Sequence, residues 1–140
     1  MRQTQVLELK DAELMLEAAV MRAQREGWKV SMAIVDQGGC LIAFKRLDGA
    51  TISSVTTSID KARSAALTKR PTKFFEEMVN SGRNGAAMIH GVFPVEGGLP
   101  IAVDGEVVGG FAVSGLKSEM DILVVEAGLS ALDSSQRRID

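Results

Sequence analysis

Cysteine and histidine are almost absent from this chain of 140 residues. Cys40 is the only cysteine, so the chain can form neither an internal disulfide nor a cysteine cluster for a metal. His90 is the only histidine, which leaves too few of the usual nitrogen and sulfur ligands for a zinc site. The sequence therefore predicts no metal centre.

Aromatic residues, excess charge and long apolar runs are scarce as well. The chain has five Phe, one Trp and no Tyr, and its formal net charge is −2. Nucleic-acid binding depends on a basic face, and single-strand binding adds aromatic stacking, so we expect no nucleic-acid partner. The N-terminus lacks the apolar stretch of a secretory signal, and no apolar run approaches the ~20 residues of a membrane span. These absences predict a cytoplasmic protein without a membrane partner.

Glycine, in contrast, is concentrated in one stretch. Six of the 14 glycines lie between Glu96 and Gly115. Asp104-Gly105 separates two apolar arms there, and Asp-Gly is typical of the type I′ turn of a β-hairpin. The pairs Gly97-Gly98 and Gly109-Gly110 indicate a bulge, or a close approach of backbone or ligand. We expect these glycines to flatten one wall of a binding pocket.

Hydrophobic periodicity places the remaining elements. Apolar residues recur at helical spacing in four segments, and bulky and small residues alternate in the strands. Helices joined to hairpins, without βαβ units, indicate an α+β layer architecture with an antiparallel sheet. The length favours one domain, residues 1–140, with a polar tail from about residue 133. The predicted helices are 11–26, 53–69, 71–79 and 119–132; the strands are 28–36, 40–46, 99–103 and 106–113, with a short strand or irregular segment at 88–95.

Charged residues near helices and strand ends are the first candidates for a site. Lys61 shares a helix face with Ser54, and a desolvated lysine could bind an anion or act as a base. An exposed lysine is the ordinary alternative. Arg46 and Asp48 could line the mouth of a pocket, with Arg46 binding a carboxylate bidentately. Otherwise Asp48, like Asp36, is a turn residue and Arg46 a solvated strand end.

Two further candidates lie on either side of the glycine-rich hairpin. Ser114 and Gly115 precede a helix N-terminus, which attracts anions, although they can equally form a plain strand-to-helix turn. The spacing of the nearby glycines fits neither the dinucleotide-binding motif nor the phosphate loop. His90 could act as an axial ligand or a general base, but nothing nearby in sequence orients it.

Several motifs taken together resemble the GlcG/HbpS family, which includes the C-terminal domain of PduO-type proteins. The resemblance implies a sheet of about five antiparallel strands flanked by helices, in the order α-ββ-α-α-β-ββ-α or α-ββ-αα-ββ-α, often in homo-oligomers. It also implies a haem-binding branch, in which a histidine near the N-terminus is associated with haem; this chain has none there. The matching motifs are Val35-Asp36-Gln37-Gly38-Gly39, Arg46-Leu47-Asp48-Gly49-Ala50, Asp60-Lys61-Ala62, Pro71-Thr72, Gly97-Gly98-Leu99-Pro100-Ile101, Gly105, Val108-Gly109-Gly110, Val113-Ser114-Gly115 and Asp121.

Three functions remain open on the sequence. The favoured hypothesis is a homo-oligomeric small-molecule-binding protein, accessory to a catabolic pathway, whose ligand is a small organic anion or haem. The alternative is a small catabolic enzyme, an isomerase, tautomerase or hydrolase acting on a carboxylated metabolite, with Lys61 or His90 as base and Asp36, Asp48 or Glu96 as partner. An oligomeric accessory protein without a ligand is the third. The predicted ligand-binding residues are Arg46, Asp48, Ser54, Lys61, Gly97, Gly98, Ser114 and Gly115.

Overall fold

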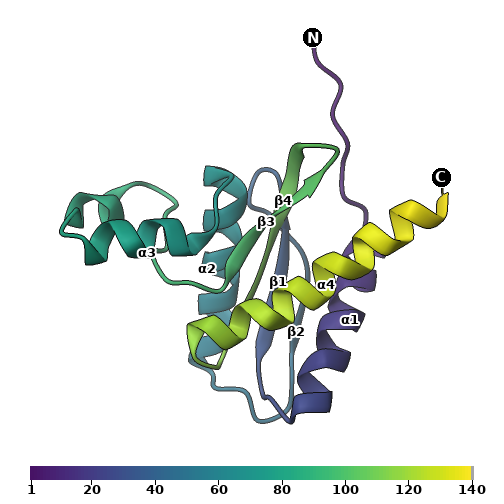
Figure 1. Cartoon of the computed structure of the whole chain (residues 1–140), viewed down its shortest axis with the longest axis horizontal. Helices are drawn as coiled ribbons and strands as arrows, with labels where there is room; N and C mark the ends of the chain where they lie inside the picture. Colours follow the sequence, from purple (N-terminus) through teal and green to yellow (C-terminus); the bar gives the residue numbers. More distant parts are fainter. Residues whose placement is uncertain (140) are drawn as a thin grey trace.

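The computed structural model describes residues 1–139, with side chains described up to Asp133, and has four α-helices and four strands (Figure 1). A 3-10 helix, η1, follows the third α-helix. None of the helices among these residues is long and apolar enough to cross a membrane. The elements in chain order are α1 (Leu9–Glu26), β1 (Ser31–Asp36), β2 (Leu41–Arg46), α2 (Ser53–Thr68), α3 (Thr72–Asn80), η1 (Asn84–Met88), β3 (Gly98–Val103), β4 (Glu106–Ser114) and α4 (Ser118–Ile139).

The four strands form one antiparallel sheet in the order β2-β1-β4-β3. The α+β class and the order α-ββ-αα-ββ-α are confirmed, but the expected fifth strand is not part of this sheet. Residues 89–95, where a strand is one predicted alternative, form turns and irregular backbone. Ser31 in the central strand β1 lies opposite both Arg46 and Ser114, so the ends of three strands meet there.

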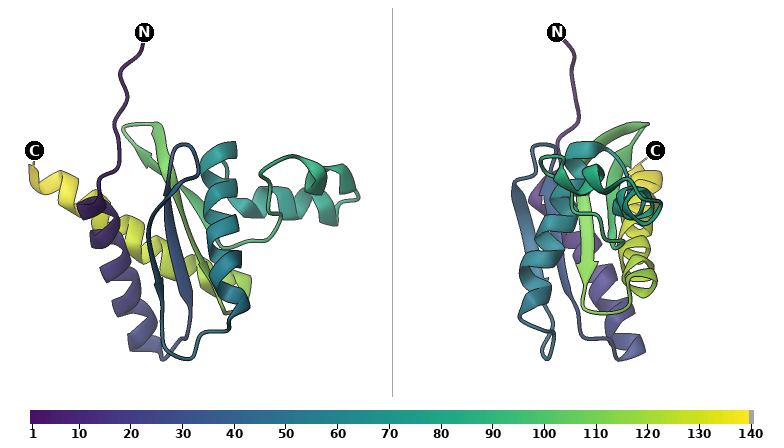
Figure 2. Two further views of the ribbon diagram at one scale, coloured as in Figure 1. Left: turned by 180° about the vertical axis from the view of Figure 1, so that it is seen from behind. Right: turned by 90° about the vertical axis from the view of Figure 1, so that its left-hand side faces the viewer.

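Helices cover both faces of the sheet, and residue size decides which helix lies where (Figure 2). The bulky residues of β1, Met32 and Ile34, face the layer formed by α1 and α4. The small residues face α2, which presents alanines and can therefore approach the sheet closely. Alternation of bulky and small residues in the strands predicted these two faces. The small-residue cluster consists of Ala33, Val35, Ala62, Ala66 and Ala112.

The glycine-rich hairpin owes its sequence to this close packing. Asp104 and Gly105 have φ values of 52° and 77°, as the predicted turn requires. The β3–β4 register shifts between Ile101, which lies opposite Gly109, and Ala102, so the pairing is irregular there, as at a bulge. A Cβ on Gly98 would lie 2.7 Å from the carbonyl oxygen of Lys61, and one on Gly110 would overlap the carbonyl oxygen of Ala62. These glycines therefore bring β3 and β4 against the α2 backbone.

Two helix ends differ from the predicted ones by more than one residue. α1 begins at Leu9 and not at residue 11, because Glu8 is its N-cap; Asp11 completes a capping box by accepting a hydrogen bond from the Glu8 N–H at 2.9 Å. The predicted end at residue 26 is confirmed, and the C-cap Gly27 has a φ of 72°. α4 continues to Ile139, past the predicted boundary at residue 132.

The segment formed by α3 and η1 projects from the side of the molecule, away from the sheet (Figures 1 and 2). Its two helices pack chiefly on each other. Apolar side chains remain exposed on it and on the neighbouring part of α2. These side chains are Leu67, Phe74, Met88 and Ile89.

Candidate functional site

Lys61 is buried and ion-paired, and it is not an exposed surface lysine. Its side chain is 2% exposed, and Nζ donates hydrogen bonds to Asp121 Oδ2 and to the Val113 carbonyl oxygen, each at 3.3 Å. Asp121 is 1% exposed and also accepts a hydrogen bond from the Leu116 N–H at 3.1 Å. The pair therefore has partners for several of its polar atoms inside the fold.

Gly97 makes room for this pair. Lys61 belongs to α2 and Asp121 to α4, and these helices cover opposite faces of the sheet. A Cβ on Gly97 would lie 2.5 Å from Lys61 Nζ, so the lysine passes the sheet edge where Gly97 leads into β3. Gly97 has a φ of 135°, which few other residues adopt. The Lys61–Asp121 ion pair thus requires a glycine at position 97.

Burial changes the pKa of Asp121. Desolvation raises the pKa of Asp121 from 3.8 to about 6, and the nearby Glu96 charge adds a smaller increase. The Lys61 charge and the hydrogen bonds from Leu116 and Lys61 act in the opposite direction but do not cancel it. The Glu96 side chain is 15% exposed, and its carboxylate is also 4.0 Å from Nζ of the exposed Lys73.

The other predicted residues near Lys61 make internal contacts. Ser54 Oγ is 2.8 Å from Ser31 Oγ, and both side chains are buried. Gly98 N–H donates a hydrogen bond to the buried Thr72 Oγ1 at 3.0 Å. Ser114 is buried beside Ser31. Gly115 packs closely on the loop before β1, because a Cβ on Gly115 would lie 2.8 Å from the Lys29 carbonyl oxygen.

Arg46 and Asp48, in contrast, lie on the surface and share a hollow of about 390 Å³ between the end of α1 and the end of β2. Lys29 and Trp28 belong to the same lining. We name this cavity the Trp28 hollow. Its other lining residues are Gln24, Gly27 and Leu47. Arg46 and Asp48 thus lie at one hollow, and Lys61 is not among its lining residues.

His90 lies at a different hollow, of about 300 Å³, together with Asp60 and Arg63 from the outer side of α2. Residues 91–93 complete the lining, and we name it the His90 hollow. Cys40, which the sequence pattern places in a strand, lies exposed just before β2. Asp36 is a turn residue, in line with one alternative: its Oδ1 accepts hydrogen bonds from Gly38 and Cys40.

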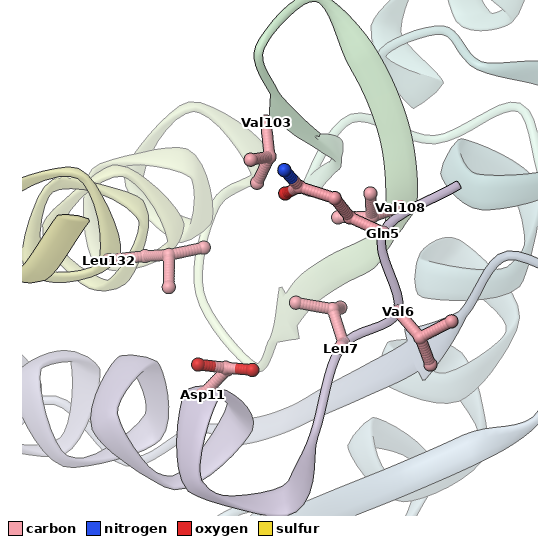
Figure 3. A pocket seen from close by; sticks show the side chains of 7 residues that line it. All are labelled: Gln5, Val6, Leu7, Asp11, Val103, Val108 and Leu132. Atoms are coloured by element: carbon pink, nitrogen blue, oxygen red, sulfur yellow. The ribbon is translucent and has the colours of Figure 1, made fainter. Parts of the chain in front are cut away.

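A third, smaller pocket of about 50 Å³ lies under the N-terminal segment (Figure 3). Leu7 and Leu132 point toward one another across it, and Val103 and Val108 belong to its apolar lining. Residues 4 and 5 contact both hairpin turns. Gln37 Nε2 donates hydrogen bonds to Thr4 Oγ1 at 3.0 Å and to the Gln5 carbonyl oxygen at 3.2 Å, and Gln5 Nε2 donates to Asp104 Oδ2 at 3.3 Å. This segment thereby closes one end of the core.

Comparison with known proteins shows which proteins this chain is similar to. The family model described as "Haem degrading protein HbpS-like" matches residues 7–130. The chain belongs to the HbpS-like family. Protein GlcG of Escherichia coli K12 is 39% identical over 109 residues, covering 78% of this chain and 81% of that protein.

Two solved structures show the same fold as this HbpS-like chain. Klebsiella pneumoniae protein ORFY is 29% identical with a TM-score of 0.90, covering 95% of this chain and 94% of that one. A structure of a PduOC–haem complex is 27% identical with a TM-score of 0.83, covering 91% and 95%.

The family makes haem the first cofactor to consider, and among the Trp28 hollow, the His90 hollow and the pocket under the N-terminal segment only the His90 hollow contains a residue type that holds haem iron. Haem iron is held by His, Cys, Met or Tyr, and His90 is the only imidazole here. The His90 hollow is lined by the charged Asp60 and Arg63, and about 300 Å³ is the lower limit for a drug-sized ligand. The pocket under the N-terminal segment is smaller still. Among the described residues, no group of three or more His, Cys, Asp or Glu side chains is arranged to hold a metal ion.

Four residues of these hollows are not among the residues predicted to bind a ligand: Trp28, Lys29, Asp60 and Arg63. Lys29 and Trp28 precede β1, and only the fold brings them beside the end of β2. Asp60 and Arg63 could have been paired by their i, i+3 spacing, which places them on neighbouring positions of one helix face. Their position opposite His90 depends on the course of the chain after η1.

Proposed function

We propose that this HbpS-like protein binds a small organic anion in the Trp28 hollow. The observation that carries the proposal is that two cations, Lys29 and Arg46, share this hollow with one carboxylate, Asp48. No ion pair to any of the three is formed within the part of the chain whose side chains are described. The lining therefore has a charge of +1 that a monocarboxylate would balance.

The chemistry of the lining suits a carboxylate with a flat or apolar body. The Arg46 guanidinium can bind both carboxylate oxygens at once, and Lys29 adds a compact charge. Trp28 offers an indole ring face next to them, with Arg22 over the ring at 5.7 Å. Asp48 opposes a second negative charge, so the lining favours a monoanion over a dianion.

The end of α1 does not prevent anion binding. A helix C-terminus carries partial negative charge on its last carbonyl groups. Here the N–H groups of Gly27 and Trp28 donate to the carbonyls of Gln24 and Ala23, at 3.1 and 2.8 Å. The hollow of about 390 Å³ also lies within the usual size range of small-molecule sites.

The alternative functions have less support from the geometry. Lys61 Nζ is enclosed and ion-paired, so a role as a catalytic base would require the pair to open. Haem is supported by the description of the family and by the PduOC–haem complex. A role in binding would make the protein an accessory to the pathway that uses the anion, as the resemblance implies.

We also propose that copies of the chain associate through the projecting segment. Met88 is 84% exposed, and Leu67, Phe74 and Ile89 are exposed near it. Large exposed apolar side chains gathered on one part of a molecule can mark an interaction surface. Sedimentation of the wild type against Met88→Glu tests this: we expect an oligomer that the glutamate variant disrupts, and a monomeric wild type would refute it.

Fluorescence of Trp28 tests the anion proposal, because it is the only tryptophan. Titration with acetate, lactate and benzoate should give a saturable change, tightest for benzoate. Arg46→Gln should weaken binding by about tenfold, the loss of a charge-assisted hydrogen bond. Asp48→Asn should strengthen it, since a repulsive charge is removed. Haemin is titrated in parallel and followed by its Soret band.

Lys45→Gln is the matched control. Lys45 precedes Arg46 on β2 and carries the same charge, but it does not line the hollow. Equal weakening in Lys45→Gln and Arg46→Gln would show that only net charge matters and would overturn the site. A Soret shift without any response to the carboxylates would favour haem instead.

A further inference from the structure

The charged residues that line the His90 hollow differ from those that line the Trp28 hollow. Arg63 and Asp60 carry opposite charges, and His90 adds a ring that can donate or accept a hydrogen bond. Asp60 and Arg63 are three residues apart on α2, where side chains are neighbours. Nevertheless, among the described side chains, no ion pair joins them or joins either to His90.

The hollow is held in shape by its backbone. Val92 N–H donates to the Ile89 carbonyl oxygen at 3.1 Å, which closes a turn with His90 and Gly91 at its centre. Gly91 has a φ of 84°, which a glycine adopts without strain. The next residue but one, Phe93, donates its N–H to the buried Ser64 Oγ at 3.0 Å. His90 is therefore presented by a turn that is anchored to α2.

Arg63 is also restricted in position. A Cβ on Gly39 would lie 3.4 Å from Arg63 Nε, so this side chain extends over the β1–β2 turn. The absence of a side chain at Gly39 thus leaves space for the guanidinium. Leu67, one turn of α2 further on, lies between the β1–β2 turn and the His90 turn, because its Cδ1 is 3.6 Å from a Cβ position on Gly39 and 3.1 Å from one on Gly91.

We propose that the His90 hollow is a second binding site, for a small zwitterion that carries both a carboxylate and an ammonium group, such as a free amino acid. Arg63 binds the carboxylate with its planar fork, and Asp60 accepts hydrogen bonds from the ammonium group. The His90 ring donates a further hydrogen bond to one of the two carboxylate oxygens. A plain anion would be repelled by Asp60 and a plain amine by Arg63, so only a zwitterion satisfies both charges.

This site is independent of the anion site proposed above. The two hollows share no lining residue, and each contains a residue type that occurs once in the chain, Trp28 in one and His90 in the other. Tryptophan fluorescence therefore reports one hollow, and the imidazole proton resonances in an NMR spectrum report the other. Failure of either proposal can be recognised without reference to the other.

The test is an NMR titration of the full chain with free alanine, propionate and ethylamine, followed at the His90 ring protons. We expect a saturable shift of the His90 resonances with alanine. Propionate and ethylamine should each bind with at most a tenth of the affinity of alanine, because each lacks one charge-assisted hydrogen bond worth about tenfold. Arg63→Gln and Asp60→Asn should each weaken alanine binding by about tenfold. Arg46→Gln, in the other hollow, should leave it unchanged.

Three results would overturn the proposal. One is that His90 does not respond to alanine up to tens of millimolar. Another is that propionate binds as well as alanine and Asp60→Asn has no effect, which would make the hollow a plain anion site. The third is equal weakening by Arg46→Gln, which would indicate a general charge effect. Asp60 and Arg63 are exposed, and circular dichroism verifies that their variants fold.

Discussion

Lys61 and Asp121 form a buried ion pair although their helices, α2 and α4, cover opposite faces of the sheet. Their Nζ and Oδ2 atoms are 3.3 Å apart, and the lysine side chain passes the sheet edge at Gly97. The pair therefore joins the two helical layers at a point where the sheet does not separate them. A buried pair is costly to break, because the remaining charge stays desolvated.

Removing one partner should destabilise the protein strongly. Lys61→Met leaves the Asp121 carboxylate buried without its cation, and we expect a loss of about 3–5 kcal/mol in the free energy of unfolding measured in urea. The double variant Lys61→Met with Asp121→Leu should recover most of it. Lys73→Met is the control: Lys73 is 55% exposed and lies 3.9 Å from Glu77, so about 0–1 kcal/mol is expected. Equal losses in both single variants would contradict a role for burial.

The raised pKa of Asp121 should make stability depend on pH in a defined direction. The folded-state pKa of about 6 exceeds the ordinary 3.8, so the folded state binds the proton more tightly than the unfolded state does. The stabilising contribution of this group is fully present below 3.8 and is lost as pH rises through about 6. Urea denaturation across this window should show that wild type loses stability relative to Asp121→Asn as pH rises. A difference that stays constant, or grows in the other direction, would rule this out.

Close packing of β4 on α2 should make Gly110 intolerant of a side chain. A Cβ there would overlap the Ala62 carbonyl oxygen, and neither backbone can move without shifting the helix. We expect Gly110→Ala to lower the free energy of unfolding by about 1–3 kcal/mol or more. Gly85→Ala is the control, since nothing lies within 4 Å of a Cβ at that position. Melting temperatures that fall equally in both variants would be inconsistent with this packing, and so would melting temperatures that stay at the wild-type value in both.

The N-terminal segment should stabilise the core through one residue. Leu7 is buried against Val108 and Leu132, and Leu7→Ala would enlarge the pocket shown in Figure 3 at a cost of about 2–5 kcal/mol. Val6 is 71% exposed, so Val6→Ala should change stability by no more than about 0.5 kcal/mol. Chemical denaturation distinguishes the two. A small effect of Leu7→Ala would mean that the segment opens readily.

Local features of the sequence predicted much of the fold. The Asp104-Gly105 turn follows from the φ values that a type I′ turn demands, and the two faces of β1 follow from alternating residue size. The weakest predictions were helix ends and the strand around residues 88–95, where no periodic pattern competes with local turn formation. The site was predicted in part: Arg46 and Asp48 share a hollow, but Lys61 lies elsewhere, in the interior.

The sequence by itself determined the strands, their turns and the small-residue face of α2, because these depend on backbone preferences and on residues close together in the chain. Tertiary structure alone decided that Lys61 is buried with Asp121, sixty residues later, and that Trp28 and His90 each lie beside charged residues of another element. The physical reason is that burial and electrostatic pairing depend on distances through space. Gly97 shows the connection: its lack of a side chain is visible in the sequence, but the lysine that needs the space is visible only in the fold.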